Sequence, residues 1–238
     1  MDGALMALID AATVCQPVRR WFVVGGNMVN LHVLRSGLNL PTRATPDVDL
    51  ALPKRTIYQG ELLGRLVGLG YRTPTYPNRF ERDLDGAHAQ VDIVTASGST
   101  KHEPNIDIDG RNFDGMPGVD EALDRDPIEV DVTADLTDGT SIAAQVRIPD
   151  IVSAIAMKTF AVAERHNEKD AVDLGHLLHI ARAAGAESDT WPRGKAFAAA
   201  KVQLAAQFDK PGHALELATD SDRTKVRLRD IASLLAQT

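Results

Sequence analysis

Three aspartates stand where a metal ion could be bound. Asp47 and Asp49 are two residues apart in a predicted strand over residues 47–52, so both side chains project from the same face. Their Cα atoms would lie about 6.6 Å apart, at about 3.3 Å per residue. Asp92 lies inside another apolar strand, predicted over residues 89–95, and completes a triangle if the two strands pair. Such a group favours Mg²⁺ or Mn²⁺, which take oxygen ligands and are commonly shared with substrate phosphates.

Two alternatives to this site follow from the same residues. Asp47 and Asp49 could lie on the solvated face of an edge strand, because an Asp-x-Asp pattern often occurs without a metal. Asp131 could replace Asp92 as the third carboxylate, but it alternates with Val130 and Val132 as in an ordinary half-exposed strand. Asp92 is therefore the preferred third ligand.

A pair of glycines precedes a predicted helix. Gly25 and Gly26 follow the apolar run 21–24, which predicts a buried strand, and they precede helical spacing over residues 28–34. Glycine lets the backbone approach a phosphate closely, and a helix N-terminus offers free N–H groups to an anion. Asn27 could cap this helix or contact a phosphate through its amide. A simple strand-to-helix turn is the alternative interpretation.

Candidate phosphate ligands follow later in the chain. Lys158 lies at the polar edge of a predicted apolar helix over residues 151–163, where its ammonium group could bind a triphosphate or extend into solvent. Arg165 follows this helix. Asp170 and Asp173 are three residues apart on the next predicted helix and are expected to orient the cations.

The elements that must position these residues change character near residue 150. Before it, strand and helix patterns alternate, whereas only helical spacing follows it. The predicted domains are therefore residues 1–149 and 150–238. Helices are predicted over residues 3–15, 28–34, 56–69, 151–163, 170–184, 196–208 and 222–236. Strands are predicted over residues 21–24, 47–52, 89–95, 128–132 and 144–148, the last two as a hairpin around Asp138-Gly139, and residues 96–127 are predicted to be a long loop.

The combination of these motifs is more specific than its parts. A strand, a Gly-Gly pair, a helix, an Arg-x-Thr-x-Asp-x-Asp segment and a Val-Asp-Ile strand follow one another, and a lysine, an arginine, a Lys-Asp pair and an Asp-Leu pair come later. This order resembles the nucleotidyltransferase superfamily with the DNA polymerase β-type fold. It is most similar to the AbiEii-type branch, which contains toxins of toxin–antitoxin pairs. The resemblance covers roughly residues 20–180, and Asn27 departs from it because the family usually has Ser or Thr there.

The resemblance implies an α/β (α+β) fold of polymerase β type, with a short mixed sheet followed by a C-terminal helical domain. It implies a metal-dependent nucleotidyltransferase that moves a nucleoside monophosphate from an NTP to an acceptor hydroxyl. The implied acceptor is RNA, at the 3′ end of a tRNA, and the implied partner is an antitoxin protein. The implied catalytic residues are Asp47, Asp49, Asp92 and Lys158, of which the three aspartates would bind the metal. The implied nucleotide-binding residues are Gly25, Gly26, Asn27, Arg43, Thr45, Lys158 and Arg165.

Two other classes of function stay open. One is a small-molecule nucleotidyltransferase of the antibiotic-modifying (aminoglycoside-like) kind, in which the acidic stretch 103–138 would attract a cationic substrate. The other is a nucleotide-binding module without catalysis, which Asn27 favours because it replaces the usual hydroxyl residue.

Composition limits the environment and the partners. The net charge of −7 argues against a broad, non-specific coat of nucleic acid, so contact with RNA is expected to be local. The basic cluster near the C-terminus places Arg223 and Arg227 on one helix face and Lys225 and Arg229 on another. The single cysteine, Cys15, is compatible with a reducing cytoplasm, and no apolar run approaches the ~18 residues of a membrane span. A cytoplasmic protein without membrane contact is expected.

Overall fold

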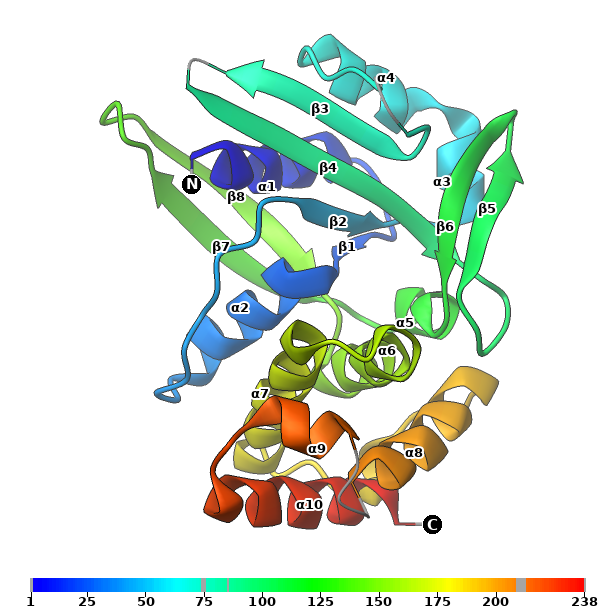
Figure 1. Cartoon of the computed structure of the whole chain (residues 1–238). Coiled ribbons are helices and arrows are strands. Elements are labelled where there is room, and N and C mark those ends of the chain that lie inside the picture. Colours follow the sequence, from blue (N-terminus) through cyan, green and yellow to red (C-terminus); the bar gives the residue numbers. More distant parts are fainter. Residues whose placement is uncertain (1, 74–75, 85, 209–212, 238) are drawn as a thin grey trace.

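The computed structural model describes residues 2–73, 76–84, 86–208 and 213–237. The chain has a mixed α/β fold up to residue 148 and is helical after it, which confirms the predicted fold class and the change of character near residue 150 (Figure 1). None of the described helices is long and apolar enough to cross a membrane.

The main sheet has six strands and is mixed. Its order is β1-β2-β4-β6-β5, and β3 pairs with β4 off this path. β2 and β6 run parallel to β4, whereas the other neighbouring pairs are antiparallel. The long strand β4 is the centre of the sheet because its apolar residues are buried on both faces. The strands are β1 (Phe22–Val23), β2 (Val48–Ala51), β3 (Arg79–Leu84), β4 (Ala87–Ala96), β5 (Glu103–Ile108) and β6 (Arg111–Met116).

A separate hairpin and the first helix cover one side of this sheet. Strands β7 (Ile128–Asp135) and β8 (Ser141–Ile148) pair antiparallel, which confirms the predicted hairpin. Helix α1 (Asp2–Cys15) lies between β4 and β8 (Figure 1). The approach to β4 is close, since a Cβ atom on Gly3 would lie 2.0 Å from the carbonyl oxygen of His88.

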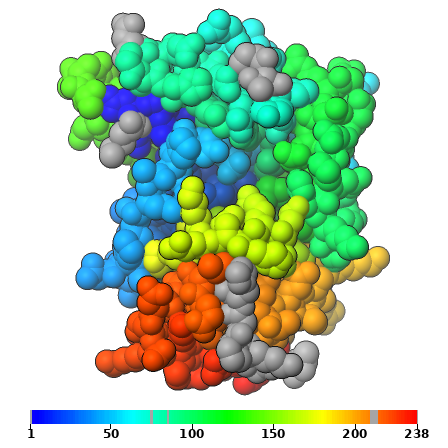
Figure 2. All heavy atoms as spheres, in the orientation of Figure 1, coloured from blue at the N-terminus to red at the C-terminus, as the bar shows by residue number. Residues whose placement is uncertain are grey.

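The helical region packs against α2 (Gly25–Ser36) on the other side. Helix α2 contacts α6 and α7, and one continuous hydrophobic core includes Leu50 of the sheet together with Leu174 and Leu177 of α7. Figure 2 shows the yellow residues of the helical region lying directly against the blue residues of the first part. The division into domains at residue 150 stays a prediction. The helices of this region are α6 (Ile151–Arg165), α7 (Glu168–Ala183), α8 (Lys195–Phe208), α9 (His213–Ala218) and α10 (Asp222–Ala236), with a 3₁₀ turn η1 (Ser188–Thr190).

The long loop predicted over residues 96–127 is wrong. This stretch forms β5, β6 and the short helix α5 (Val119–Leu123). Asp109 and Gly110 make the turn between the strands with positive φ values of 55° and 73°, as expected for an Asp-Gly hairpin turn. The prediction failed because β5 is mostly exposed and both strands are rich in polar residues, so their hydrophobic periodicity is weak.

Two further predictions are corrected near the glycines. The single helix over residues 56–69 is wrong, because Gly60 with φ 73° separates α3 (Lys54–Gln59) from α4 (Glu61–Gly68). The helix predicted over residues 28–34 begins earlier, since Gly25 is already the first residue of α2.

Candidate metal and nucleotide site

The three predicted carboxylates meet at one place. The parallel register of β2 and β4 sets Asp49 directly opposite Asp92, and Asp47 immediately precedes β2. One carboxylate oxygen from each of the three lies within 4.8 Å of the others, so the group could hold a metal ion. Asp131 lies on β7 in the separate hairpin, which shows that the alternative with Asp131 as third ligand is wrong.

The charge of this cluster is poorly compensated at Asp49. Burial, together with the neighbouring carboxylates of Asp47 and Asp92, raises the pKa of Asp49 to about 7. Lys158 and Arg165 act against this shift, which shows that their positive charges are near enough to matter. A bound cation would remove the repulsion among the three carboxylates.

The two glycines are required by close packing at the start of α2. Gly25 has φ 67°, and a Cβ atom there would lie 1.9 Å from Oδ2 of Asp49. At Gly26, a Cβ atom would lie 2.3 Å from Cγ2 of Thr45 and 2.6 Å from a guanidinium nitrogen of Arg43. The absence of side chains therefore lets Asp49, Thr45 and Arg43 converge on the N-terminus of α2, where N–H groups could donate hydrogen bonds to a phosphate.

Two asparagines on α2 fix the segment that carries these residues. Asn27 donates from Nδ2 to the carbonyl oxygen of Asp47 at 2.8 Å, so its side chain positions Asp47 and does not cap the helix. Asn30 donates to the carbonyl oxygen of Arg43 at 2.8 Å and accepts from its N–H at 3.2 Å. The idea that Asn27 is the helix cap is therefore wrong, because Val24 occupies that position.

The predicted cations converge on two carboxylates of α7. Arg43 donates two hydrogen bonds to Asp173, of 3.1 and 2.9 Å. Lys158 bridges Asp173 at 2.7 Å and Asp170 at 3.0 Å, and Arg165 lies 2.9 Å from Asp170. The prediction that Asp170 and Asp173 orient the cations is confirmed by these contacts.

The surroundings of Lys158 differ from the prediction. It is 4% exposed and enclosed between α6 and α7, so the expected position at a polar helix edge is wrong. The helix turns this lysine inward because Asp170 and Asp173 are buried and need a cation. The side chains of Arg43 and Arg165 are more accessible, with exposed fractions of 33% and 52%.

Arg79 is a member of the site that the sequence analysis missed. It stands opposite Asp92 in the antiparallel pair of β3 and β4, and its guanidinium donates to both carboxylate oxygens at 2.9 and 2.8 Å. Asp49, Asp92 and Arg79 therefore form one row across three strands. The sequence pair Asp85-Gly86, a hairpin-turn signal, could have indicated β3 and so this arginine.

Comparison with known proteins gives little that bears on this site. No protein-family model and no curated protein matches the chain. Among solved structures, the chain is similar to the antibiotic-resistance factor ANT(2'')-Ia, with a TM-score of 0.42 and 10% sequence identity over 86% of this chain and 92% of that one.

Proposed function

We propose that the chain is a metal-dependent nucleotidyltransferase that moves a nucleoside monophosphate from an NTP to an acceptor hydroxyl. The observation that carries this proposal is the row of carboxylates on β2 and β4, set beside a glycine-rich helix N-terminus and a cluster of three cations. Each part has other uses in proteins. Together they supply what nucleotidyl transfer needs, namely a metal site, an anion site and positive charge for a triphosphate.

The residues present fit a divalent metal ion. Asp47, Asp49 and Asp92 offer hard oxygen ligands within 4.8 Å of one another. Asp49 keeps its proton unusually well, with a pKa of about 7, because burial and two neighbouring carboxylates disfavour its ionised form. A bound Mg²⁺ or Mn²⁺ would neutralise charge that develops on the transferring phosphoryl group.

The other residues are assigned to binding and positioning the NTP. The N–H groups at Gly25, Gly26 and Asn27 would receive phosphate oxygens at the start of α2. Arg43 and Arg165 are the accessible cations and would contact the phosphates directly. Lys158 is enclosed, so we assign it to holding Asp170 and Asp173 and to adding positive charge from behind. Thr45 packs on Gly26 and positions the strand that carries Asp47.

In the reaction, the acceptor hydroxyl oxygen forms a bond with the α-phosphorus of the NTP. The bond between that phosphorus and the oxygen leading to the β-phosphate breaks, and pyrophosphate leaves. The hydroxyl proton passes to a carboxylate of the cluster. Asp92 is the proposed acceptor of this proton, which requires Arg79 to release at least one of its oxygens.

We further propose RNA, at a tRNA 3′ end, as the acceptor and the role of a toxin with a cognate antitoxin. This finer assignment is supported by the motif resemblance alone. The alternative acceptor is a small molecule of the aminoglycoside kind, and transfer of the nucleotide label distinguishes it from RNA.

The test is transfer of label from α-³²P NTPs, one base at a time, to total RNA and to a set of aminoglycosides in the presence of Mg²⁺. We expect label on RNA with the wild type and none with Asp49→Asn, while Asp131→Asn on the separate hairpin keeps full activity. Label on an aminoglycoside would favour the small-molecule alternative. Thermal stabilisation by Mg²⁺ and NTP without any transfer would favour a non-catalytic nucleotide-binding module. Neither transfer nor stabilisation would contradict the proposed function.

A further inference from the structure

A groove in the helical region gathers arginines from two helices. Two adjoining pockets of about 520 and 470 Å³ share Arg182 and Arg227. Arg182 is near the end of α7, and Arg223 and Arg227 are one turn apart on α10. We call this surface the arginine groove. It is lined by Leu38, Asn39, Leu40, His179, Arg182, Ala183, Arg223, Thr224 and Arg227, and in the second pocket also by Asp230, Ile231, Ser233, Leu234 and Gln237.

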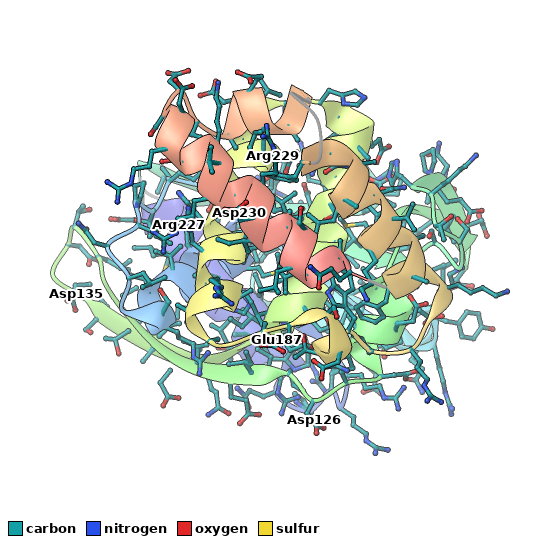
Figure 3. All side chains as sticks on the ribbon, turned by 90° about the horizontal axis from the view of Figure 1, so that it is seen from below. Asp126, Asp135, Glu187, Arg227, Arg229 and Asp230 are labelled. Carbon is teal, nitrogen blue, oxygen red and sulfur yellow. The ribbon has the colours of Figure 1, made fainter. Side chains whose placement is uncertain are left out.

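The positive charge of the arginine groove is not neutralised within the part of the chain that the structure describes. None of Arg182, Arg223 and Arg227 has a carboxylate within ion-pair distance there, and all three side chains are exposed. Asp230 is the single carboxylate among the lining residues, and Figure 3 shows it on α10 near Arg227. The charge of Arg227 reaches into the groove, since it lowers the pKa of His179, second to the effect of burial.

A second arginine-rich pocket on the molecule differs in this respect. It is lined by Arg19, Arg20, Arg55 and Arg65, and two of these four are neutralised, because Arg20 pairs with Asp124 and Arg65 pairs with Glu61. The other cations of α10 are also engaged, because Lys225 pairs with Glu216 and Arg229 donates to the carbonyl oxygen of Phe208 at 3.3 Å. Single arginines without an ion pair also occur elsewhere, but the arginine groove brings three of them, Arg182, Arg223 and Arg227, together on two neighbouring helices. This is notable in a chain of net charge −7.

The chemistry of the groove fits phosphodiester groups. Each guanidinium offers a planar pair of donors that matches two phosphate oxygens, and arginine is favoured for this reason at nucleic-acid surfaces. Arg223 and Arg227 are four residues apart, which separates their Cβ atoms by about 5–6 Å, so they can contact neighbouring phosphates of one strand. Leu38, Leu40, Ile231 and Leu234 also line the groove, so an acidic protein segment is the alternative occupant that the experiment must separate from RNA.

One segment of the chain joins the arginine groove to the candidate active site. Leu38 and Leu40 line the groove, and the same segment continues to Arg43, held by Asp173, and to Asp47 of the metal cluster. Asp47 is seven positions after Leu40, so the two sites are at most about 25 Å apart along an extended chain. A nucleic acid with one end at the carboxylates can therefore pass its backbone over the groove.

We propose that the arginine groove binds the phosphate backbone of an RNA. Its use as the binding surface for the acceptor of nucleotidyl transfer rests on the proposed function, whereas RNA binding by the groove does not. The contacts are to phosphates, so the groove contributes affinity and register and no base specificity.

The test is binding of a fluorescein-labelled RNA hairpin with a single-stranded 3′ end, followed by fluorescence anisotropy at several salt concentrations. We expect Arg223→Ala/Arg227→Ala to bind about 10-fold more weakly at low salt and to lower the slope of log K against log salt by about 0.9 per lost duplex phosphate contact. Arg182→Ala should act in the same direction. The matched control is Lys225→Ala/Arg229→Ala, which removes the same charge from the other faces of α10 and should leave the slope unchanged. Equal weakening in both double variants would overturn the proposal, because it would show an effect of net charge alone.

Two further arms separate the alternatives. Polyglutamate that displaces the RNA from the wild type, with the same dependence on Arg223 and Arg227, would overturn RNA in favour of an acidic protein partner. Inorganic triphosphate that saturates the groove and removes RNA binding would point to a small phosphate ligand and would equally overturn it. The variant Asp49→Asn should bind the hairpin as the wild type does. If the variant binds the hairpin in this way while Mg²⁺ and NTP give no thermal stabilisation of the wild type, RNA binding by the arginine groove is supported and the proposed nucleotidyltransferase function is contradicted.

Discussion

The three carboxylates of the candidate metal site are chemically unequal. Asp92 has both oxygens bound by Arg79, so its charge is largely satisfied before any ligand arrives. Asp49 lies beside Gly25 and has no such guanidinium partner among the described residues, and its pKa is raised to about 7 because its ionised form is disfavoured there. The ionised carboxylate of Asp49 therefore lowers the stability of the folded protein, as is common where function requires a buried charge.

We expect Asp49→Asn to stabilise the protein at high pH. The pKa of Asp49 is raised to about 7 in the folded state, so the folded protein holds this proton more tightly than the unfolded chain does. Stability from this group is complete below about pH 4 and is lost as the pH rises toward 7. At pH 8 the amide should raise the free energy of unfolding by up to about 4 kcal/mol over the wild type, and at pH 4 by almost nothing.

Urea unfolding at both pH values, in EDTA, measures this difference. Asp131→Asn, on the exposed face of β7, serves as the control and should leave both values unchanged. A gain for Asp49→Asn that is equal at pH 4 and pH 8 would contradict the assignment, because it would not depend on ionisation.

We expect Arg79→Ala to make stability depend strongly on Mg²⁺. Removing one partner of a largely buried ion pair leaves Asp92 uncompensated, which costs about 3 kcal/mol or less here because Arg79 is itself partly exposed. A divalent cation can then bind Asp92 without competition, so Mg²⁺ should raise the melting temperature of the variant more than that of the wild type. Melting curves with EDTA and with millimolar Mg²⁺ give the measurement. An identical shift by Mg²⁺ in both proteins would show that Arg79 does not compete for Asp92.

At the scale of elements, the accuracy of the sequence analysis followed the strength of hydrophobic patterning. The buried strand with Val91 and Ile93 and the apolar helix with Ile155 were located because tertiary packing and local periodicity agree there. β3 was missed, since Arg79, Glu81 and other charged residues obscure its alternation. Pairing across strands cannot be read from periodicity, so the Asp92–Arg79 contact and the inward turn of Lys158 became visible only in the folded chain.

The two ends of α2 allow a matched test of the Gly-Gly motif. Gly25 and Gly37 flank the helix with nearly equal φ values of 67° and 66°, but only a Cβ atom at Gly25 would meet another group, Oδ2 of Asp49 at 1.9 Å. Gly37→Ala should therefore cost only the left-handed backbone strain of about 1–2 kcal/mol. Gly25→Ala should cost more, and it should also abolish stabilisation by Mg²⁺ because Asp49 must move.

Thermal melting of both variants, with and without Mg²⁺, gives the comparison. Combining Gly25→Ala with Asp49→Ala should recover part of the loss, since the second substitution removes the clash. Equal costs for Gly25→Ala and Gly37→Ala would show that Gly25 is needed only for its backbone conformation.

At the scale of the whole molecule, the candidate site ties the α/β part to the helical region. Arg43, from the segment before β2, donates to Asp173 of α7, and His32 of α2 contacts the carbonyl oxygen of Pro149 at the entry to α6. The hydrophobic core continues across the same boundary. Residues that would bind the phosphates thus also join the two parts, so a ligand at this place should stabilise both together.

The two parts should therefore unfold in one transition, although the sequence predicts domains at residues 1–149 and 150–238. The chain has two tryptophans, one in each part: Trp21 is buried beside β1, and Trp191 packs edge-on against Phe197 of α8.

The fluorescence of two single-tryptophan variants measures the unfolding of each part. The variant Trp191→Phe keeps Trp21 and reports the α/β part, whereas Trp21→Phe keeps Trp191 and reports the helical region. A shared core and the Arg43–Asp173 ion pair across the boundary make separate unfolding costly, so the two urea midpoints should coincide with each other and with circular dichroism, after correction for each variant's own stability. Mg²⁺ with NTP should move both by the same amount. Separate midpoints, with only the tryptophan of the α/β part responding to Mg²⁺, would show instead that the helical region folds independently of the carboxylate site.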